Sequence, residues 1–537
     1  MMLLTSILGT VILLGSCIFI HELGHLLGGK MVGIKAKIFS IGYGRGFWKK
    51  TVGDTTYQIT LIPLGGYCQF YGDDPSEPRT GEGFEFLSAH PFKRIVTVAM
   101  GPIFNLIFGV IIFFVMNLVG YTKETNKILI PNEMTSQEAW QQFIETNKII
   151  IPEGITSENY LSAAYKSGIR TGDRIISIDG KEVKAFSDIQ VKAFFSDGSD
   201  CEVKVQRGEE TKTFTVKPSY NEAEGRYTFG VMPYTEGVMI SRVTSGSAAE
   251  LSGLTKGDMI QKVNGRGSII STYITSEIQK GKEITFSFLR NGEEKSTTFK
   301  PAMTDIFTIT SINGKKRHTI IGDGELKQSI SNGGVRVDGK PIFKYDELLK
   351  DITDAADSNS NVTVNIDKNR YVGHVKIKRQ YMAGIGQQEV FENIYVKYGF
   401  AEGLLQSIIE PKDFLAMNIK GLAMMIRGKL SVRENLSGPI RIGEITGYVL
   451  YYKGVADFIL LIAKISVILM FMNLLPIPAV DGSHLIFYTI EIIRGKPIDE
   501  KIMAKIQTFG ILFLITLGVL VIINDISMLQ FIQNLFD

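Results

Sequence analysis

The sequence predicts a multi-domain membrane protein in which an α-helical core of four transmembrane helices carries a large β-rich insert. Four segments are apolar enough to cross a bilayer, which takes about 20 helical residues. They lie at residues 1–27, 95–119, 458–475 and 509–523. The long region between the second and third segments alternates glycine-rich turns with short strand-like runs. A chain of 537 residues is too long for one compact domain.

Composition excludes several classes of protein. Hydrophobic residues make up 45% of the chain, and the formal charge of +3 is close to balance. We therefore expect no nucleic-acid partner, because such proteins carry a basic footprint. The three cysteines are scattered at Cys17, Cys68 and Cys201. Their number and spacing predict neither a disulfide framework nor a cysteine-based zinc site.

Basic residues predict the orientation in the membrane. The first segment is expected to be a retained span, because no Lys or Arg precedes it and it has no small-residue cleavage site. The loop after it holds nine basic residues, and the loop between the last two segments holds four. Since such loops stay in the cytoplasm, both termini and the insert are expected outside.

Two segments of the insert repeat one pattern. Residues 167–180 read SGIRTGDRIISIDG, and residues 252–265 read SGLTKGDMIQKVNG. Each combines a Gly-Asp turn, an alternating strand and a tight Asp-Gly or Asn-Gly turn that favours a hairpin. The pattern resembles PDZ domains, which take peptide termini by strand addition. Another small β domain with hairpin turns is the alternative. A fainter echo, VRVDG at residues 335–339, leaves open whether there are two or three PDZ-like α+β domains.

The end of the first apolar segment carries the strongest chemical signal. Residues 21–25 read HELGH, and on a helix His21 and His25 share a face, so both imidazoles can reach one metal ion. Glu22 lies beside them and can take a proton from an attacking water. Two helix-end histidines at a membrane interface are the alternative, but ionisable residues in an apolar span are costly and usually functional.

A catalytic zinc site usually has a third protein ligand. The best candidate is distant: residues 473–482 read NLLPIPAVDG, and Asp481 follows two prolines that break a helix at membrane depth. Irregular backbone there is tolerated only when it is buried or lines a cavity. An ordinary helix cap is the alternative for Asp481.

These motifs together resemble the site-2 protease family, and the PDZ-like insert resembles its regulator-of-sigma-E branch. Further segments agree with that resemblance. They are FSIGYG at 39–44, IPLGGY at 62–67, GPIFN at 101–105, GKLS at 428–431 and NLSGP at 435–439.

The resemblance implies a bacterial inner-membrane metalloprotease core. It assigns His21, His25 and Asp481 as ligands of one Zn²⁺ per chain and Glu22 as the general base. It places Asn473 near the substrate, where its amide would stabilise charge on the scissile carbonyl or brace the broken helix. We interpret His484 as a histidine at a helix start facing the cytoplasmic interface, with a role beside the metal ligands as the alternative.

A strand-like run at residues 55–62 leads into Gly65 and Gly66. The resemblance implies a membrane-associated β-hairpin here. We expect its edge, with Ile59, Ile62 and Tyr67, to pair with a locally unwound substrate. An ordinary cytoplasmic hairpin is the alternative.

The expected domains follow from these segments. They are a first half of the protease core (1–120), a first PDZ-like domain with its linker (121–235), a second (236–302), a third candidate β-rich domain (303–400), an interfacial helix and connector (401–457), and the second half of the core (458–537).

The implied activity is hydrolysis within or beside the bilayer. By resemblance the partners are single-span membrane proteins trimmed beforehand by an upstream protease, such as anti-sigma factors, or remnant signal peptides. The active site would lie toward the cytoplasm. Three other readings remain: a membrane-anchored PDZ scaffold, a protease for soluble peptides, and a metal-dependent transporter, which the small number of spans disfavours.

Overall fold

The chain forms two compact units. The membrane unit contains Met1–Tyr121 and Tyr395–Leu529, and the insert unit contains Thr122–Ile394. The computed structural model describes residues 2–74, 78–134, 161–221, 226–267, 269–310, 317–322, 324–358, 360–367, 369–428 and 438–528. Residues 429–431 and 435–437, from two of the segments named above, lie outside the described residues.

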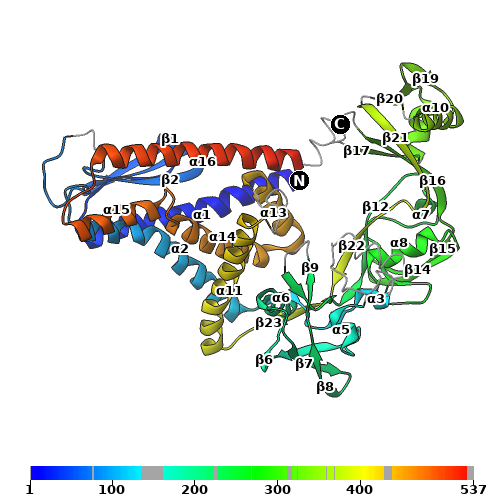
Figure 1. The fold of residues 1–537 in the computed structure, drawn as a ribbon, viewed down its shortest axis with the longest axis horizontal. Coiled ribbons are helices and arrows are strands. Elements are labelled where there is room, and N and C mark those ends of the chain that lie inside the picture. The colour runs from blue at the N-terminus through cyan, green and yellow to red at the C-terminus, as the bar shows by residue number, and fades with distance from the viewer. Residues whose placement is uncertain are drawn as a thin grey trace. The chain divides into compact units, whose positions relative to one another are not determined.

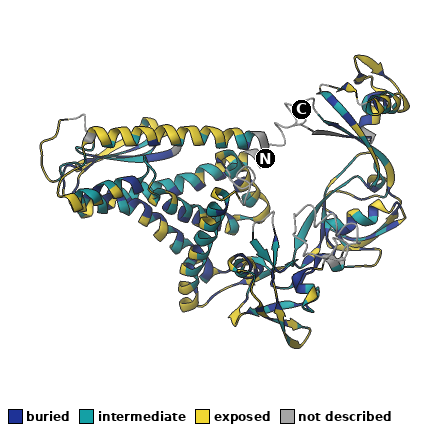
Figure 2. Cartoon of the chain, viewed as in Figure 1, coloured by how far each residue is buried: buried dark blue, intermediate teal, exposed yellow. Residues whose placement is uncertain are grey.

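Four helices of the described chain are long and apolar enough to span a membrane, which confirms the prediction. They are α1 (Met2–Met31), α2 (Pro91–Val119), α14 (Val455–Leu474) and α16 (Glu500–Met528). The last begins well before the apolar run that predicted it, because the polar residues before Phe509 are also good helix formers. Figure 2 shows α16 exposed along most of its length, and only 6% of its apolar window is buried.

The hairpin of β1 (Ala36–Val52) and β2 (Thr55–Phe70) curls into a small sheet. The first part of β1, residues 36–41, pairs with residues 66–70 on one side and with residues 56–59 on the other. Residues 56–59 also pair with the last part of β1. The segment at 66–70 is therefore at an edge of this sheet, and residues 56–59 lie in its interior.

Further helices complete the membrane unit (Figure 1). They are α11 (Phe400–Ile426), α13 (Pro439–Tyr448), the π-helical turn η1 (Val449–Lys453) and α15 (Asp481–Arg494). The helix expected near residues 404–426 is present as α11, while its place on a membrane surface stays a prediction. Arg94 of α2 fixes α15 through a 2.6 Å ion pair with Glu491 and stacks on the Tyr488 ring.

The insert unit contains three main antiparallel sheets, each with its own buried cluster. The first has the order β6-β5-β7-β8, with α5 (Ala163–Lys166) and α6 (Phe186–Phe195). The second has the order β15-β14-β13-β12-β22, with α7 (Ala248–Leu251) and α8 (Ser271–Gln279). The third has the order β17-β16-β21-β20-β18-β19, with α9 (Gly324–Ser331) and α10 (Tyr345–Asp357).

The strands of these sheets have the following bounds. They are β5 (Arg174–Ile178), β6 (Lys181–Glu182), β7 (Cys201–Arg207), β8 (Glu210–Val216), β12 (Thr235–Val243), β13 (Met259–Val263), β14 (Ile284–Arg290), β15 (Glu293–Phe299), β16 (Ala302–Thr310), β17 (Arg317–Ile321), β18 (Val335–Val337), β19 (Lys340–Ile342), β20 (Asn361–Ile366), β21 (Asn369–Met382) and β22 (Ile385–Phe391). Short elements β3 (Tyr121–Glu124), β4 (Ile128–Leu129), α3 (Pro131–Met134), β9 (Ser219–Asn221), β10 (Arg226–Thr228), β11 (Met232–Pro233) and β23 (Asn393–Val396) connect them.

The tight turns predicted in the insert are present in all three sheets. Asp179, Asn264 and Asp338 each have a φ near +50° and precede a glycine with positive φ. Such a pair of left-handed residues matches the twist of a two-residue hairpin. Strands pair across the turns at Asp179 and Asp338, and an isolated bridge between Val263 and Arg266 closes the turn at Asn264.

One boundary expected from the sequence is wrong. Strand β22 pairs with β12 along its length and so completes the second sheet, although it follows the third sheet in the chain. The third sheet, residues 302–382, is therefore inserted between two strands of the second. A division by sequence order places β22 in the third domain because strand pairing at this separation leaves no local pattern.

Candidate metal centre

Close packing of α1 on α2 fixes the HELGH segment. A side chain on Gly24 would place its Cβ 2.2 Å from the backbone oxygen of Met100. A side chain on Gly101 would place its Cβ 2.4 Å from the ring of His25. Both positions require glycine, because small residues allow the two helix backbones to approach. The second glycine also leaves the space that the His25 imidazole occupies.

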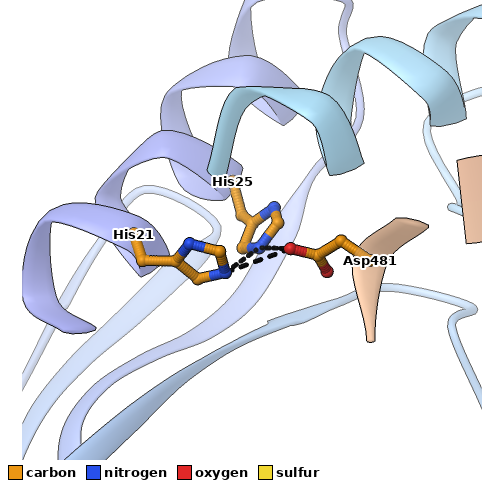
Figure 3. A group of neighbouring side chains, drawn as sticks. All are labelled: His21, His25 and Asp481. Carbon is orange, nitrogen blue, oxygen red and sulfur yellow. Dashed lines mark hydrogen bonds and ion pairs between the residues drawn. The ribbon is translucent and has the colours of Figure 1, made fainter. Parts of the chain in front are cut away.

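Three side chains from opposite ends of the chain converge here (Figure 3). Nε2 of His21 lies 3.2 Å from Nε2 of His25. Oδ2 of Asp481 lies 3.1 Å from the first nitrogen and 3.5 Å from the second. The side chains are only 11%, 12% and 20% exposed. Among the described residues, these three form the one group of His, Cys, Asp and Glu with the spacing of a metal site.

The triangle has the size of one face of a zinc tetrahedron. Ligands about 2.0–2.2 Å from a central Zn²⁺ lie about 3.3–3.6 Å from one another. The three observed separations are 3.1, 3.2 and 3.5 Å. Two imidazoles and a carboxylate are also a ligand set that zinc favours. The residues therefore fit this metal.

The hydrogen bonds around the triangle agree with a cation at its centre. Nδ1 of His25 lies 3.0 Å from the backbone oxygen of Thr97, which can only accept a hydrogen bond. That nitrogen therefore carries the proton, and the lone pair of Nε2 faces the triangle. Oδ2 of Asp481 is buried and has no hydrogen-bond partner among the described residues. Lone pairs that meet in a buried space are stable only if positive charge lies between them.

The proline-containing turn aims Asp481 at the histidines. Helix α14 ends at Leu474, and α15 begins at Asp481 after the N-cap residue Val480. Asp481 is therefore the first residue of its helix and not its cap. A side chain on Gly482 would place its Cβ 2.1 Å from the backbone oxygen of Leu475. Glycine at 482 is thus required by the close return of the chain onto the end of α14.

Glu22 lies between the metal triangle and the edge of the β1–β2 sheet. Gly66 and Cys68 of this edge lie next to the Glu22 carboxylate. A Cβ on Gly66 would lie 3.4 Å from Cγ of Glu22 and 2.8 Å from the backbone oxygen of Ser40. The close approach that requires glycine at 66 is therefore to the backbone of Ser40 on the paired strand, beside Glu22.

The other residues predicted to contact substrate have different surroundings. The Asn473 amide lies 3.4 Å from Nε2 of His21, so it is at the site. Gly65 has φ +131° and contacts the ring of Tyr43, and the Tyr67 hydroxyl accepts a hydrogen bond from Gln58. The backbone of Ile62 pairs with Tyr43 alone.

Ile59 corrects the expectation for the sheet edge. Its backbone pairs with Ile41 on one side and with Trp48 on the other. An interior position of this kind has no free backbone groups to offer a substrate. The curled register places the edge at residues 66–70, and a linear strand pattern carries no signal of that curl.

Sequence reasoning missed two polar residues that support the site. The side-chain amide of Asn105, fully buried on α2, lies 3.3 Å from Nδ1 of His21. Gln507 of α16 contacts the turn before Asp481. A buried amide within an apolar span was the available signal for Asn105, because polar groups there usually have a function.

His484 also contacts residues that hold the turn before Asp481. Its ring nitrogens lie 3.4 Å from the Tyr488 hydroxyl and 3.3 Å from the Gln507 amide. Burial lowers the pKa of this imidazole, which favours its neutral form. These contacts favour a role for His484 beside the metal ligands over the interpretation that it faces the cytoplasmic interface.

Comparison with known proteins agrees with this arrangement. The model of peptidase family M50 matches residues 9–517. The regulator of sigma E protease of Haemophilus influenzae is 26% identical over 532 residues, covering 96% of this chain and 97% of that protein. The regulator of sigma-E protease RseP of Salmonella typhimurium is 25% identical, covering 97% and 98%. A protein of Borreliella burgdorferi with the provisional name zinc metalloprotease is 26% identical, covering 98% and 100%.

The fold and the site define a membrane-embedded metallopeptidase. The chain belongs to peptidase family M50, since the family model covers nearly all of it. The predicted family and enzyme class are thereby confirmed.

Proposed function

We propose that this protein is an intramembrane zinc protease that performs regulated intramembrane proteolysis of single-span membrane proteins. The observation that carries the proposal is the convergence of His21, His25 and Asp481 at the end of an apolar helix. A hydrolytic centre at that depth is suited to a substrate that is itself in the membrane.

His21, His25 and Asp481 hold one Zn²⁺ per chain. When bound, zinc supplies the Lewis acidity that makes water a nucleophile near neutral pH. Glu22 accepts a proton from the attacking water and returns it to the leaving amine, as a general base and then a general acid. Asn473, whose amide lies 3.4 Å from Nε2 of His21, donates a hydrogen bond to the carbonyl oxygen as negative charge develops.

The substrate helix must unwind before it can be cut, because its peptide bonds are hidden in its own hydrogen-bond ladder. The edge segment at residues 66–70 accepts the freed strand. Gly66 of this segment already lies beside Glu22, and no other described strand pairs with its outer side. Pairing there would hold the scissile bond beside the general base and satisfy the freed backbone groups.

The insert selects substrates. The first two sheets share a Gly-Asp turn whose aspartate is bound by an arginine from a neighbouring strand: Asp173 with Arg207, and Asp258 with Arg290. This shared architecture supports two PDZ-like domains, and the Asp338 hairpin supports a third. They act either by binding a newly exposed peptide terminus or by excluding substrates with bulky outer domains.

The orientation follows from charge. The basic loops face the cytoplasm, and the termini and the insert lie outside, so the active site faces the cytoplasmic side of a bacterial inner membrane. The relatives named as regulators of sigma E favour a membrane-protein substrate of the anti-sigma-factor kind. Trimming of that substrate by an upstream protease is part of the proposal and rests on the family resemblance alone. Remnant signal peptides are a second substrate of the same chemistry.

The test is cleavage of a tagged single-span substrate by the full chain in detergent, before and after zinc removal by a chelator. We expect activity to be lost on removal and restored by added zinc, and Asp481→Asn to be inactive with little bound metal. Equal cleavage with and without metal would overturn the proposal. Absence of metal from the wild-type protein would instead favour a scaffold that binds peptides through its insert.

A further inference from the structure

The turn that presents Asp481 contains an unusual backbone conformation. Ala479, two residues before the proposed metal ligand, has φ +77°. This left-handed region is unfavourable for any residue with a Cβ, so it persists only where the surrounding structure holds it. Flanking contacts must therefore stabilise the turn.

A single side chain from α16 supplies those contacts. The backbone N–H of Ala479 donates a 2.7 Å hydrogen bond to Oε1 of Gln507. Nε2 of Gln507 lies 3.2 Å from Oγ of Ser483 and 3.3 Å from Nε2 of His484. One amide thus binds the chain on both sides of Asp481.

The direction of these hydrogen bonds is unambiguous. A backbone N–H can only donate, so the oxygen of the Gln507 amide must face Ala479, and its nitrogen must face Ser483 and His484. Ser483 in turn donates to the backbone oxygen of Val480 at 2.8 Å. These hydrogen bonds join the residues on both sides of the ligand into one network.

Helix α16 also packs against the turn through Gly510, one helical turn after Gln507. A Cβ on Gly510 would lie 2.3 Å from Cβ of Pro478 and 2.4 Å from its backbone oxygen. Residues 507 and 510 share a face of the helix. The remainder of α16 is largely exposed, so this face is a main point of contact between the helix and the site.

We propose that Gln507 is a positioning residue for Asp481: its amide holds Ala479 in the left-handed conformation and thereby fixes the carboxylate of the metal ligand. The inference rests on the proposed function, in which Asp481 binds zinc. It adds that the last membrane helix controls the geometry of the metal site through one amide.

The first experiment measures the rate at which zinc leaves the full-length protein in detergent, for the wild type and for variants. A chromogenic chelator captures the released metal and reports the rate. Gln507→Leu keeps the size of the side chain and removes its hydrogen bonds. We expect zinc to dissociate roughly 10–100-fold faster, which is the usual effect of losing a residue that orients a ligand. Thr508→Val, an exposed neighbour on the same helix, is the matched control and should release zinc at the wild-type rate.

A second variant separates positioning from general stability. Glycine adopts the left-handed conformation without strain, so in Ala479→Gly the turn no longer needs the Gln507 hydrogen bond to hold it. In the Ala479→Gly background, Gln507→Leu should accelerate zinc release by less than about threefold. In the wild-type background, Gln507→Leu should lower kcat for cleavage with little effect on KM. The reason is that the proposed substrate-binding edge, residues 66–70, belongs to β2 and does not involve the turn before Asp481.

The outcomes separate the two proposals. Equal zinc release from wild type and Gln507→Leu would overturn the positioning role while the zinc protease stands. An effect of Gln507→Leu that is undiminished by Ala479→Gly would also overturn it, since the loss would then come from disturbed helix packing. A wild-type protein that holds no zinc, or a His21→Ala variant that holds as much as wild type, would instead contradict the proposed function.

Discussion

Oδ2 of Asp481 lies 3.1 Å from Nε2 of His21, although the two residues come from opposite ends of the chain. The insert unit separates the two halves in sequence. Neither half can therefore form the metal centre alone, and the site exists only when α1, α2 and α15 are packed together.

Asn105 supports His21 through its side-chain amide, so we expect Asn105→Leu to lower zinc affinity by roughly 10–100-fold. Competition with a chelator of known affinity measures the change. Asn117→Leu is the control, because Asn117 is also a buried amide of α2 but contacts Gly403 instead of the site. Equal losses in the two variants would show that only helix packing had been disturbed.

Gly101 leaves room for the imidazole of His25, so Gly101→Ala should displace the ring and reduce zinc affinity by at least roughly tenfold. The bound metal can be measured by elemental analysis of the purified protein. Gly518→Ala introduces the same methyl group into α16, where nothing lies within 4 Å. It should retain full zinc content, and full content in Gly101→Ala would contradict the observed close contact.

Gly66 lets the edge strand close onto the backbone of Ser40 beside Glu22, so Gly66→Ala should shift the edge strand and misplace it relative to the carboxylate. We expect cleavage to fall by about 10–100-fold, the usual cost of misplacing reacting groups by about 1 Å. Zinc content should stay unchanged, because the ligands come from α1 and α15. Gly53→Asn at the β1–β2 turn, where the residue faces open space, should cleave normally. Normal cleavage by Gly66→Ala would argue against strand addition at this edge.

The pair of Asp258 and Arg290 predicts a pH dependence for the second sheet of the insert. Burial raises the pKa of Asp258, but hydrogen bonds from Arg290 and from the Thr255 N–H lower it more, so the pKa is below its usual value. A depressed pKa means that the pair stabilises the fold above the unfolded-state pKa of about 3.9. That contribution is lost as the pH falls through the lower folded-state pKa.

Hydrogen exchange in the full chain measures this effect. Asp258→Asn should lower the opening free energy of β12–β14 by roughly 1.5–3 kcal/mol at pH 7. The difference from wild type should shrink as the pH falls below about 3.9. Asp173→Asn removes the corresponding aspartate of the first sheet and should affect β5–β7 alone. A pH-independent difference would show that Asp258 acts through packing and not through its charge.

The sequence was sufficient for features that depend on local spacing. The helical repeat puts His21 and His25 on one face, and a polar residue after two prolines at membrane depth singles out Asp481. Tight turns at Asp179 and Asn264 follow from residues that accept a left-handed conformation. Each of these signals is contained within about ten residues.

Features that depend on distant pairing could not be predicted. The curl of the β1–β2 sheet puts Ile59 in its interior, and β22 returns to β12 after the whole third sheet. Gln507 is a polar residue at the start of a span, which is a common position for a solvated side chain. Its role depends on how α16 packs against the turn before Asp481, and no local pattern encodes that contact.

The most direct test of the central claim compares the wild type with Glu22→Gln. Purified full-length protein would be incubated with a model single-span substrate, and zinc would be measured in the same samples. The account predicts cleavage by wild type alone, with zinc bound in both, because the substitution removes a proton acceptor and leaves His21, His25 and Asp481 in place. Undiminished cleavage by Glu22→Gln, or zinc bound by neither protein, would contradict the account.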